Sequence, residues 1–141
     1  MADVGKIQKT YDLYVDREGT AAAITKGELV CWNYGQANGL VKKTAVDLDL
    51  MPPYGVALET CTAAAAVADG ILVAWRGVVE VKHDITADDA LYKNQGLSVS
   101  DATAGCVEAY TTAIAEYLYV GHALEDASSI TAEVKIMLAG W

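Results

Sequence analysis

Two histidines, three cysteines and a few serines are the residues of this chain that could carry out nucleophilic or acid–base chemistry. His83 is followed by Asp84 at the end of an apolar run, where a solvated or helix-capping imidazole is the simplest interpretation. His122 lies inside an apolar segment, which favours a packed or interfacial side chain over a general base. No serine stands in a G-x-S-x-G turn, and nothing in the sequence brings a thiol beside a histidine. The sequence therefore predicts no catalytic residues and no enzyme.

Residues that could hold a metal or a cofactor are also sparse. Cys31, Cys61 and Cys106 lack the close pairs of a zinc site, so we expect buried free thiols in a protein made in a reducing cytoplasm. The acidic pairs do not have the spacing of an EF-hand loop and are typical of solvated turns. Gly35 and Gly39 precede an expected strand rather than a helix, so they do not form a phosphate loop. We predict no metal and no cofactor.

The stretch Gly70–Lys82 is the element around which we expect the chain to be organised. Its odd-numbered residues are apolar from Ile71 to Val81, with Gly77 between them, and the other face becomes charged towards its end. Alternation with a period of two and many β-branched residues predicts a central strand, bent or bulged at Gly77.

The rest of the chain also predicts short strands separated by turns. Glu28–Trp32 and Leu40–Val46 read as a hairpin across a loop rich in Gly and Asn, and Tyr117–Val120 reads as a later strand. Thr60–Ala68 is alanine-rich and is the best helical candidate in the first half. The predicted fold is mostly β, a compact barrel or sandwich with one short helix and a flexible N-terminal arm.

The sequence also contains a weak internal repeat. Gly55–Glu59 matches Gly121–Glu125 in four of five positions, and each match is followed by a small-residue link and a strand that ends in Gly. Ile24–Asn33 also matches Ile85–Asn94, since both segments begin with Ile-Thr and end with Asn. We therefore expect an arm over residues 1–10 and one domain over 11–141, built from two similar β units at about 20–82 and 83–141.

Composition excludes some classes of function. With 141 residues, 53% of them hydrophobic, the chain can form a core but has no run long enough to cross a membrane. A net charge of −9 without a basic cluster disfavours binding to nucleic acid. The expected partners are therefore proteins, not nucleic acid and not a membrane.

Several segments resemble the small head-decoration, or capsid-cement, proteins of tailed bacteriophages. The resemblance is carried by KGELV (Lys26–Val30), YGVALET (Tyr54–Thr60), DGILVAWRGVVEV (Asp69–Val81) and the closing GHALEDASS and AEVKIML segments. It covers most of the chain from about Thr20, but the duplicated unit and the longer N-terminal strand depart from the shortest members.

The resemblance implies a structural virion protein on the outer surface of an assembled capsid, often a homotrimer, that stabilises the shell by bracing neighbouring major capsid proteins. On that basis we expect the arm to contact capsid protein by β-augmentation, and a second group of residues to face a sister subunit. The capsid-contact residues would be Lys6, Ile7, Gln8, Lys9 and Tyr11. The residues facing a sister subunit would be Leu40, Val41 and Trp141.

Two other functions stay open at this point. The chain could be a different structural virion component, such as a tail, fibre-base or joining protein. It could also be a small-ligand-binding β-barrel module, which would place Trp32 or Trp75 in a concave pocket.

Overall fold

The computed structural model describes residues 9–15, 23–32, 40–45, 52–62, 70–84, 90–128 and 133–139, with the backbone alone for residues 9–15 and Leu40. Within these ranges the chain forms nine strands and one short 3-10 helix, which confirms the predicted mostly β fold. The elements are β1 (Lys9–Val15), β2 (Leu29–Trp32), β3 (Leu40–Lys43), β4 (Gly55–Ala57), β5 (Gly70–Lys82), β6 (Gly96–Val99), β7 (Val107–Ala109), η4 (Glu116–Leu118), β8 (Tyr119–Ala123) and β9 (Glu133–Leu138).

The first four strands and the first half of β5 form a barrel-like unit, which we call unit 1. β2 and β3 form the predicted antiparallel hairpin, and β2 pairs on its other side with β4, which in turn pairs with β5. β1 lies antiparallel to β5 and parallel to β3, so the ring of strands closes on itself. Closure matters because a closed ring leaves no unpaired sheet edge.

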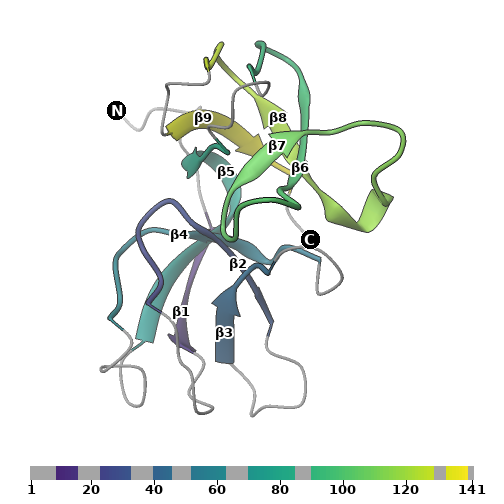
Figure 1. The fold of residues 1–141 in the computed structure, drawn as a ribbon. Coiled ribbons are helices and arrows are strands. Elements are labelled where there is room, and N and C mark those ends of the chain that lie inside the picture. Colours follow the sequence, from purple (N-terminus) through teal and green to yellow (C-terminus); the bar gives the residue numbers. More distant parts are fainter. Residues whose placement is uncertain are drawn as a thin grey trace, which may run out of the picture.

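The second half of β5 and the later strands form unit 2 with the same arrangement. β6 pairs with β7 and β8, β8 pairs with β9, and β9 pairs with β5. A parallel bridge between His83 and Val107 connects the end of β5 to β7 and completes the ring. Figure 1 shows the two units as two lobes, with β5 running from one into the other. The fold is therefore barrel-like and built from two similar units, as predicted.

The side chains of the long strand β5 pack in one core cluster before Gly77 and in another after it. Gly77 has a φ of 103°, a conformation that glycine adopts readily and other residues rarely do. Before it, Ile71 and Val73 pack in a smaller core cluster; after it, Val79 and Val81 pack in a larger one. The expectation that these residues share one face is wrong, because β5 is irregular between its two halves: Thr10 and Lys9 of β1 pair with Ala74 and Arg76, which leaves Trp75 as an extra residue just before Gly77.

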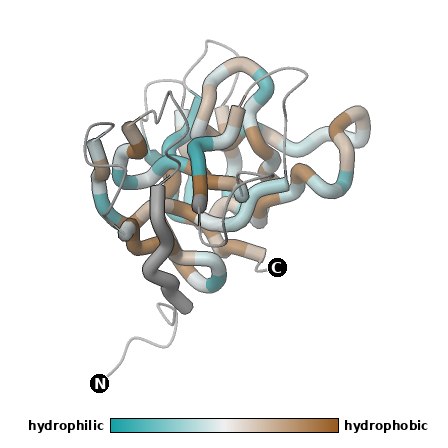
Figure 2. The backbone as a smooth tube through the Cα atoms, turned by 90° about the horizontal axis from the view of Figure 1, so that it is seen from below, coloured by the Kyte–Doolittle hydropathy of each residue, from teal (hydrophilic) through white to brown (hydrophobic). Residues whose placement is uncertain are grey.

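The two units share a core. The larger cluster combines Leu29, Val56 and Ala74 of unit 1 with side chains of unit 2 such as Leu97 and Val120. All five are fully buried. Figure 2 shows hydrophobic segments crossing the middle of the molecule, with hydrophilic stretches more common on the loops. Burial of apolar area is the main stabilising term in folding, so the two units stabilise each other.

The repeat extends to individual hydrogen bonds. Ile24 and Cys61 form an antiparallel bridge in unit 1, and Leu91 and Ala127 form the same bridge in unit 2. The N–H groups of Leu72 and Lys135 each donate to a glutamate of a GxALE segment, Glu59 at 3.0 Å and Glu125 at 2.9 Å. The predicted match of the GxALE segments is confirmed. The predicted match of Ile24 with Ile85 is wrong, because Leu91 is its structural counterpart.

Two local predictions fail. Thr60–Thr62 is not helical, because Cys61 bonds across to Ile24, and the remainder of the predicted helix (residues 63–69) lies outside the described residues. The strand expected from Tyr117 begins instead at Tyr119, after η4. Among the described residues, no helix has the length and apolar character needed to span a membrane.

Candidate functional site

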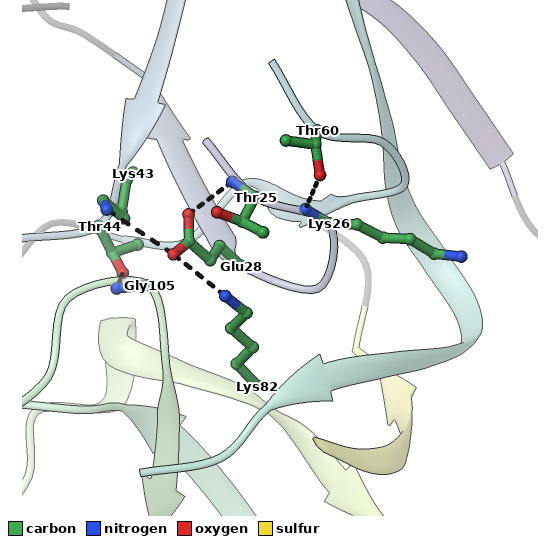
Figure 3. Close-up of polar contacts among 8 residues, drawn as sticks. All are labelled: Thr25, Lys26, Glu28, Lys43, Thr44, Thr60, Lys82 and Gly105. Carbon is green, nitrogen blue, oxygen red and sulfur yellow. Dashed lines mark hydrogen bonds and ion pairs between the residues drawn. The ribbon is translucent and has the colours of Figure 1, made fainter. Parts of the chain in front are cut away.

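A buried carboxylate lies where unit 1 meets unit 2 (Figure 3). Glu28 follows a tight turn in which Gly27 has a φ of 90°, and its Oε2 accepts the N–H of Thr25 at 2.8 Å. Its Oε1 lies 3.7 Å from Lys43 Nζ of unit 1 and 3.5 Å from Lys82 Nζ of unit 2. The Glu28 side chain is only 9% exposed, so its charge depends on these partners. The turn thus carries a charged link between the units.

Backbone hydrogen bonds fix the same junction. Gly105, in the turn between β6 and β7, donates its N–H to the Thr44 carbonyl at 3.2 Å and to Thr44 Oγ1 at 3.0 Å. Its carbonyl accepts the N–H of Leu29 at 2.8 Å, and the Lys82 N–H donates to the Gly27 carbonyl at 2.8 Å. Because these bonds involve backbone atoms of ordered strands and turns, they hold the two units in one relative orientation.

Cys106 adjoins this junction. Burial, followed by the negative charges of Asp84 and Glu28, raises the pKa of its thiol from 9.0 to about 11, while Lys82 and Lys43 act in the opposite direction. A thiol with such a pKa stays protonated at neutral pH and is a poor nucleophile. All three cysteines are buried thiols that form no disulfide, as predicted.

His83 and Asp84 are buried rather than solvated, contrary to expectation. His83 is 2% exposed because its bridge to Val107 draws it into the sheet, and neither ring nitrogen has a hydrogen-bond partner among the described residues. Ser100 Oγ donates to Asp84 Oδ2 at 2.7 Å and accepts the Thr103 N–H at 3.0 Å. The serine therefore bonds the carboxylate and the turn, and not an imidazole that could act as its base.

A cleft of about 310 Å³ opens beside the junction, between the end of β4 and the paired strands β5 and β9. Four apolar residues line it together with two lysines and one glutamate. The lining residues are Lys26, Ala57, Leu58, Val78, Val79, Glu80 and Lys135. Neither Trp32 nor Trp75 lines it; Trp32 is half-buried and packs on Tyr54 with ring centroids 4.6 Å apart. Such a cleft could hold a small acidic or amphipathic group.

Of the five residues predicted to contact a capsid, two lie in β1 and three lie outside the described residues. Lys9 and Tyr11 belong to β1, whose backbone pairs with β5. Lys6, Ile7 and Gln8 lie outside the described residues. Since β1 is already part of a closed ring, an added strand on a partner would have to come from residues before it. The boundary of the arm at residue 10 therefore falls inside β1.

The residues predicted to face a sister subunit are also separated. Val41 is fully buried in the smaller core cluster, so its side chain cannot contact a sister subunit and the prediction for it is wrong. Leu40 is described only by its backbone, which pairs with Tyr14 of β1. Trp141 lies outside the described residues. Sequence reasoning missed Glu28, Lys82 and Gly105. Gly27 indicates a turn before Glu28, but no signal in the sequence indicates the approach of Lys82 or Gly105.

Within the described ranges, no group of three His, Cys, Asp or Glu residues is arranged to hold a metal ion. The sequence matches no model of a known protein family and has no significant match among curated proteins. The functional assignment therefore depends on the geometry described above and on the resemblance noted in the sequence.

Proposed function

We propose that the chain is a structural virion protein that binds the outside of an assembled phage capsid and braces neighbouring major capsid proteins. The resemblance of the GxALE segments and the central strand to capsid-cement proteins motivates the proposal. In this role the protein works by binding alone, as a homo-oligomer with the trimer as the favoured form. It needs no catalytic group and no cofactor.

One observation of the structure carries the proposal furthest: β5 is a single strand of 13 residues that belongs to both units. Together with the buried link through Glu28 and Gly105, this makes the two units one rigid body with two outer surfaces at a fixed separation. A brace between two capsid proteins requires such a fixed span, because a flexible linker would let the neighbours move apart. The aliphatic interiors of both units also favour binding at outer surfaces over binding of a ligand inside a barrel.

The contact with capsid protein is assigned to the residues before β1. Lys6 is a positive charge in a chain of net charge −9, and Ile7 can add apolar contact, so residues 1–8 suit an extended segment laid on a capsid subunit. Many such weak contacts on one shell add up by multivalency.

The test is co-sedimentation of the purified protein with mature shells of its phage. Deletion of residues 2–8 leaves β1 intact, so it removes the proposed contact without opening the ring of unit 1. We expect saturable binding of the full chain and at least about a tenfold loss of affinity on deletion. Lys6→Glu should weaken binding, and Arg76→Glu, which reverses an exposed positive charge on β5, serves as the matched control. Absence of binding by the full chain would refute the proposal.

The cleft between β4 and β5 favours a second candidate, a small-ligand-binding module. Lys26 and Lys135 of its lining would pair with a carboxylate while Leu58 and Val79 cover an apolar body. A thermal-shift screen of small amphipathic acids tests it: ligand stabilisation that disappears in the Lys26→Glu, Lys135→Glu double variant would favour this function over the structural one.

A further inference from the structure

Unit 2 carries a second version of the surface by which unit 1 binds unit 2. In unit 1 the bonds across the junction use the Gly27 carbonyl, the Leu29 N–H and the Thr44 carbonyl. The repeat relates these groups to the Asn94 carbonyl, the Gly96 N–H and the Tyr110 carbonyl of unit 2. We call Asn94, Gln95, Gly96 and Tyr110, with the neighbouring Tyr92, the end face of unit 2.

The hydrogen bonds of the two turns establish this equivalence. The Leu29 carbonyl accepts the N–H of Thr44 at 3.1 Å, and the Gly96 carbonyl accepts the N–H of Tyr110 at 2.8 Å. Glu28 Oε2 caps its turn by accepting the Thr25 N–H at 2.8 Å. In the same way Gln95 Oε1 accepts the Tyr92 N–H at 2.9 Å, and Asn94 has a φ of 70° where Gly27 has 90°. The two surfaces have the same backbone shape.

The end face of unit 2 has a hydrogen-bonding position that no described residue fills. In a strand, the N–H and C=O of one residue point to the same side, so the Gly96 N–H points towards Tyr110. No hydrogen bond joins the Gly96 N–H to the Tyr110 carbonyl, and no described residue takes the place that Gly105 takes between Leu29 and Thr44. A backbone donor at a half-buried position favours an external acceptor. The position is therefore open to another chain.

Each of the two surfaces that would meet in a contact between two chains carries an exposed apolar residue. Tyr92 is 64% exposed and stands in the turn where unit 1 has Thr25. Leu72 is 42% exposed and is the counterpart of Lys135, as their equivalent bonds to glutamates show. Lys135 lines the cleft between the units, so Leu72 lies on the side of unit 1 that would face a neighbour in the same way. One apolar residue thus lies on each side of the expected interface.

We propose that a second copy of this chain binds the end face of unit 2 through its own unit 1, repeating between molecules the junction that each chain makes within itself. Such a head-to-tail contact generates a closed ring or a filament.

Sedimentation velocity over a range of concentrations tests the proposal with the purified protein alone. Tyr92→Asp alters the end face and Leu72→Asp alters the opposite side, and both residues are exposed enough for the variants to fold. Each variant should self-associate at least about tenfold more weakly than the wild type. A 1:1 mixture should recover one intact interface and form heterodimers without larger species.

Tyr117→Asp is the matched control, because Tyr117 is 55% exposed and takes part in none of the bonds related to the junction. It should associate like the wild type. A wild-type protein that stays monomeric up to about 100 µM would overturn the proposal. A mixture of the two variants that forms no dimers would also overturn it. Because no capsid is present, failure here is distinguishable from failure of the proposed capsid binding.

Discussion

Positions 27 and 94 illustrate how this chain repeats its chemistry with different residues. Gly27 and Asn94 both have positive φ, and asparagine is the residue that most readily replaces glycine in that conformation. The next residues, Glu28 and Gln95, both present an Oε atom to a turn N–H. What differs is charge, since Glu28 also binds two lysines across the junction. The turn is thus a shared local structure, and the carboxylate is an addition specific to the contact between units.

The raised pKa of Cys106 predicts a loss of stability at high pH. The folded thiol keeps its proton up to about pH 11, whereas the unfolded thiol loses it near 9.0, so the folded state binds more protons between these values. The free energy of unfolding contributed by this group is therefore fully present below pH 9 and falls as the pH rises towards 11. Urea denaturation at several pH values measures this effect. Between pH 9 and 11, the free energy of unfolding of Cys106→Ala should fall less than that of the wild type. Parallel curves for the two proteins would contradict the assignment.

The glycines of the two GxALE segments predict a matched pair of destabilised variants. A Cβ on Gly55 would overlap the carbonyl oxygen of Ala74, and one on Gly121 would overlap that of Met137. Since neighbouring strands cannot move without losing their ladder bonds, Gly55→Ala and Gly121→Ala should each lower the free energy of unfolding by about 1–3 kcal/mol or more. Gly96→Ala is the control, because its Cβ would meet side-chain atoms rather than backbone, with Tyr119 Cε2 at 3.3 Å and Tyr110 Cβ at 3.6 Å. Equal effects at all three positions in urea titrations would contradict this prediction.

At the scale of elements, the sequence predicts what depends on local pattern. β5 is recognisable because alternating β-branched residues specify a strand wherever it is placed, and the β2–β3 hairpin follows from its flanking loop residues. The facing change at Gly77 could not be predicted, since it depends on which core each half meets. The sequence does not reveal the correct alignment of the first segment of the repeat, because the two turns share backbone geometry while their residues, apart from Lys26 and Lys93, differ.

The link between the units predicts that Glu28→Gln destabilises the protein less than Glu28→Ala does. In Glu28→Gln the amide oxygen can still accept the Thr25 N–H, as Gln95 does in unit 2, but the attraction to Lys43 and Lys82 is lost. Both lysine side chains are partly exposed, at 28% and 31%, so they can turn to solvent, and we expect a cost of about 1 kcal/mol. Glu28→Ala loses the turn bond as well and should cost about 2 kcal/mol or more. Urea titrations of both variants measure the difference, and equal costs would assign the stabilisation to the ion pairs alone.

For the molecule as a whole, the candidate site could be predicted less well than the fold. The junction brings together residues as distant in sequence as Glu28 and Gly105, and no local pattern encodes that approach. His83 shows the same limit, because a histidine at a strand end is normally solvated, and here one bridge to Val107 buries it. The contacts that join the two units lie between residues far apart in the sequence. The sequence therefore indicates the units, and the structure shows how they are joined.

The shared core and the junction predict that the two units unfold together. Leu29 and Val56 of unit 1 pack in the cluster that also contains most of the core of unit 2, so exposing one unit removes apolar contacts from the other. Two buried thiols serve as separate probes, Cys31 in β2 of unit 1 and Cys106 beside β7 of unit 2. Pulsed thiol labelling during urea denaturation, read by mass spectrometry, should give the same midpoint for both cysteines. Glu28→Ala should lower both midpoints together. A midpoint for Cys31 that differs from that for Cys106 would mean that the units unfold independently. In that case β5 alone could not make them one rigid brace.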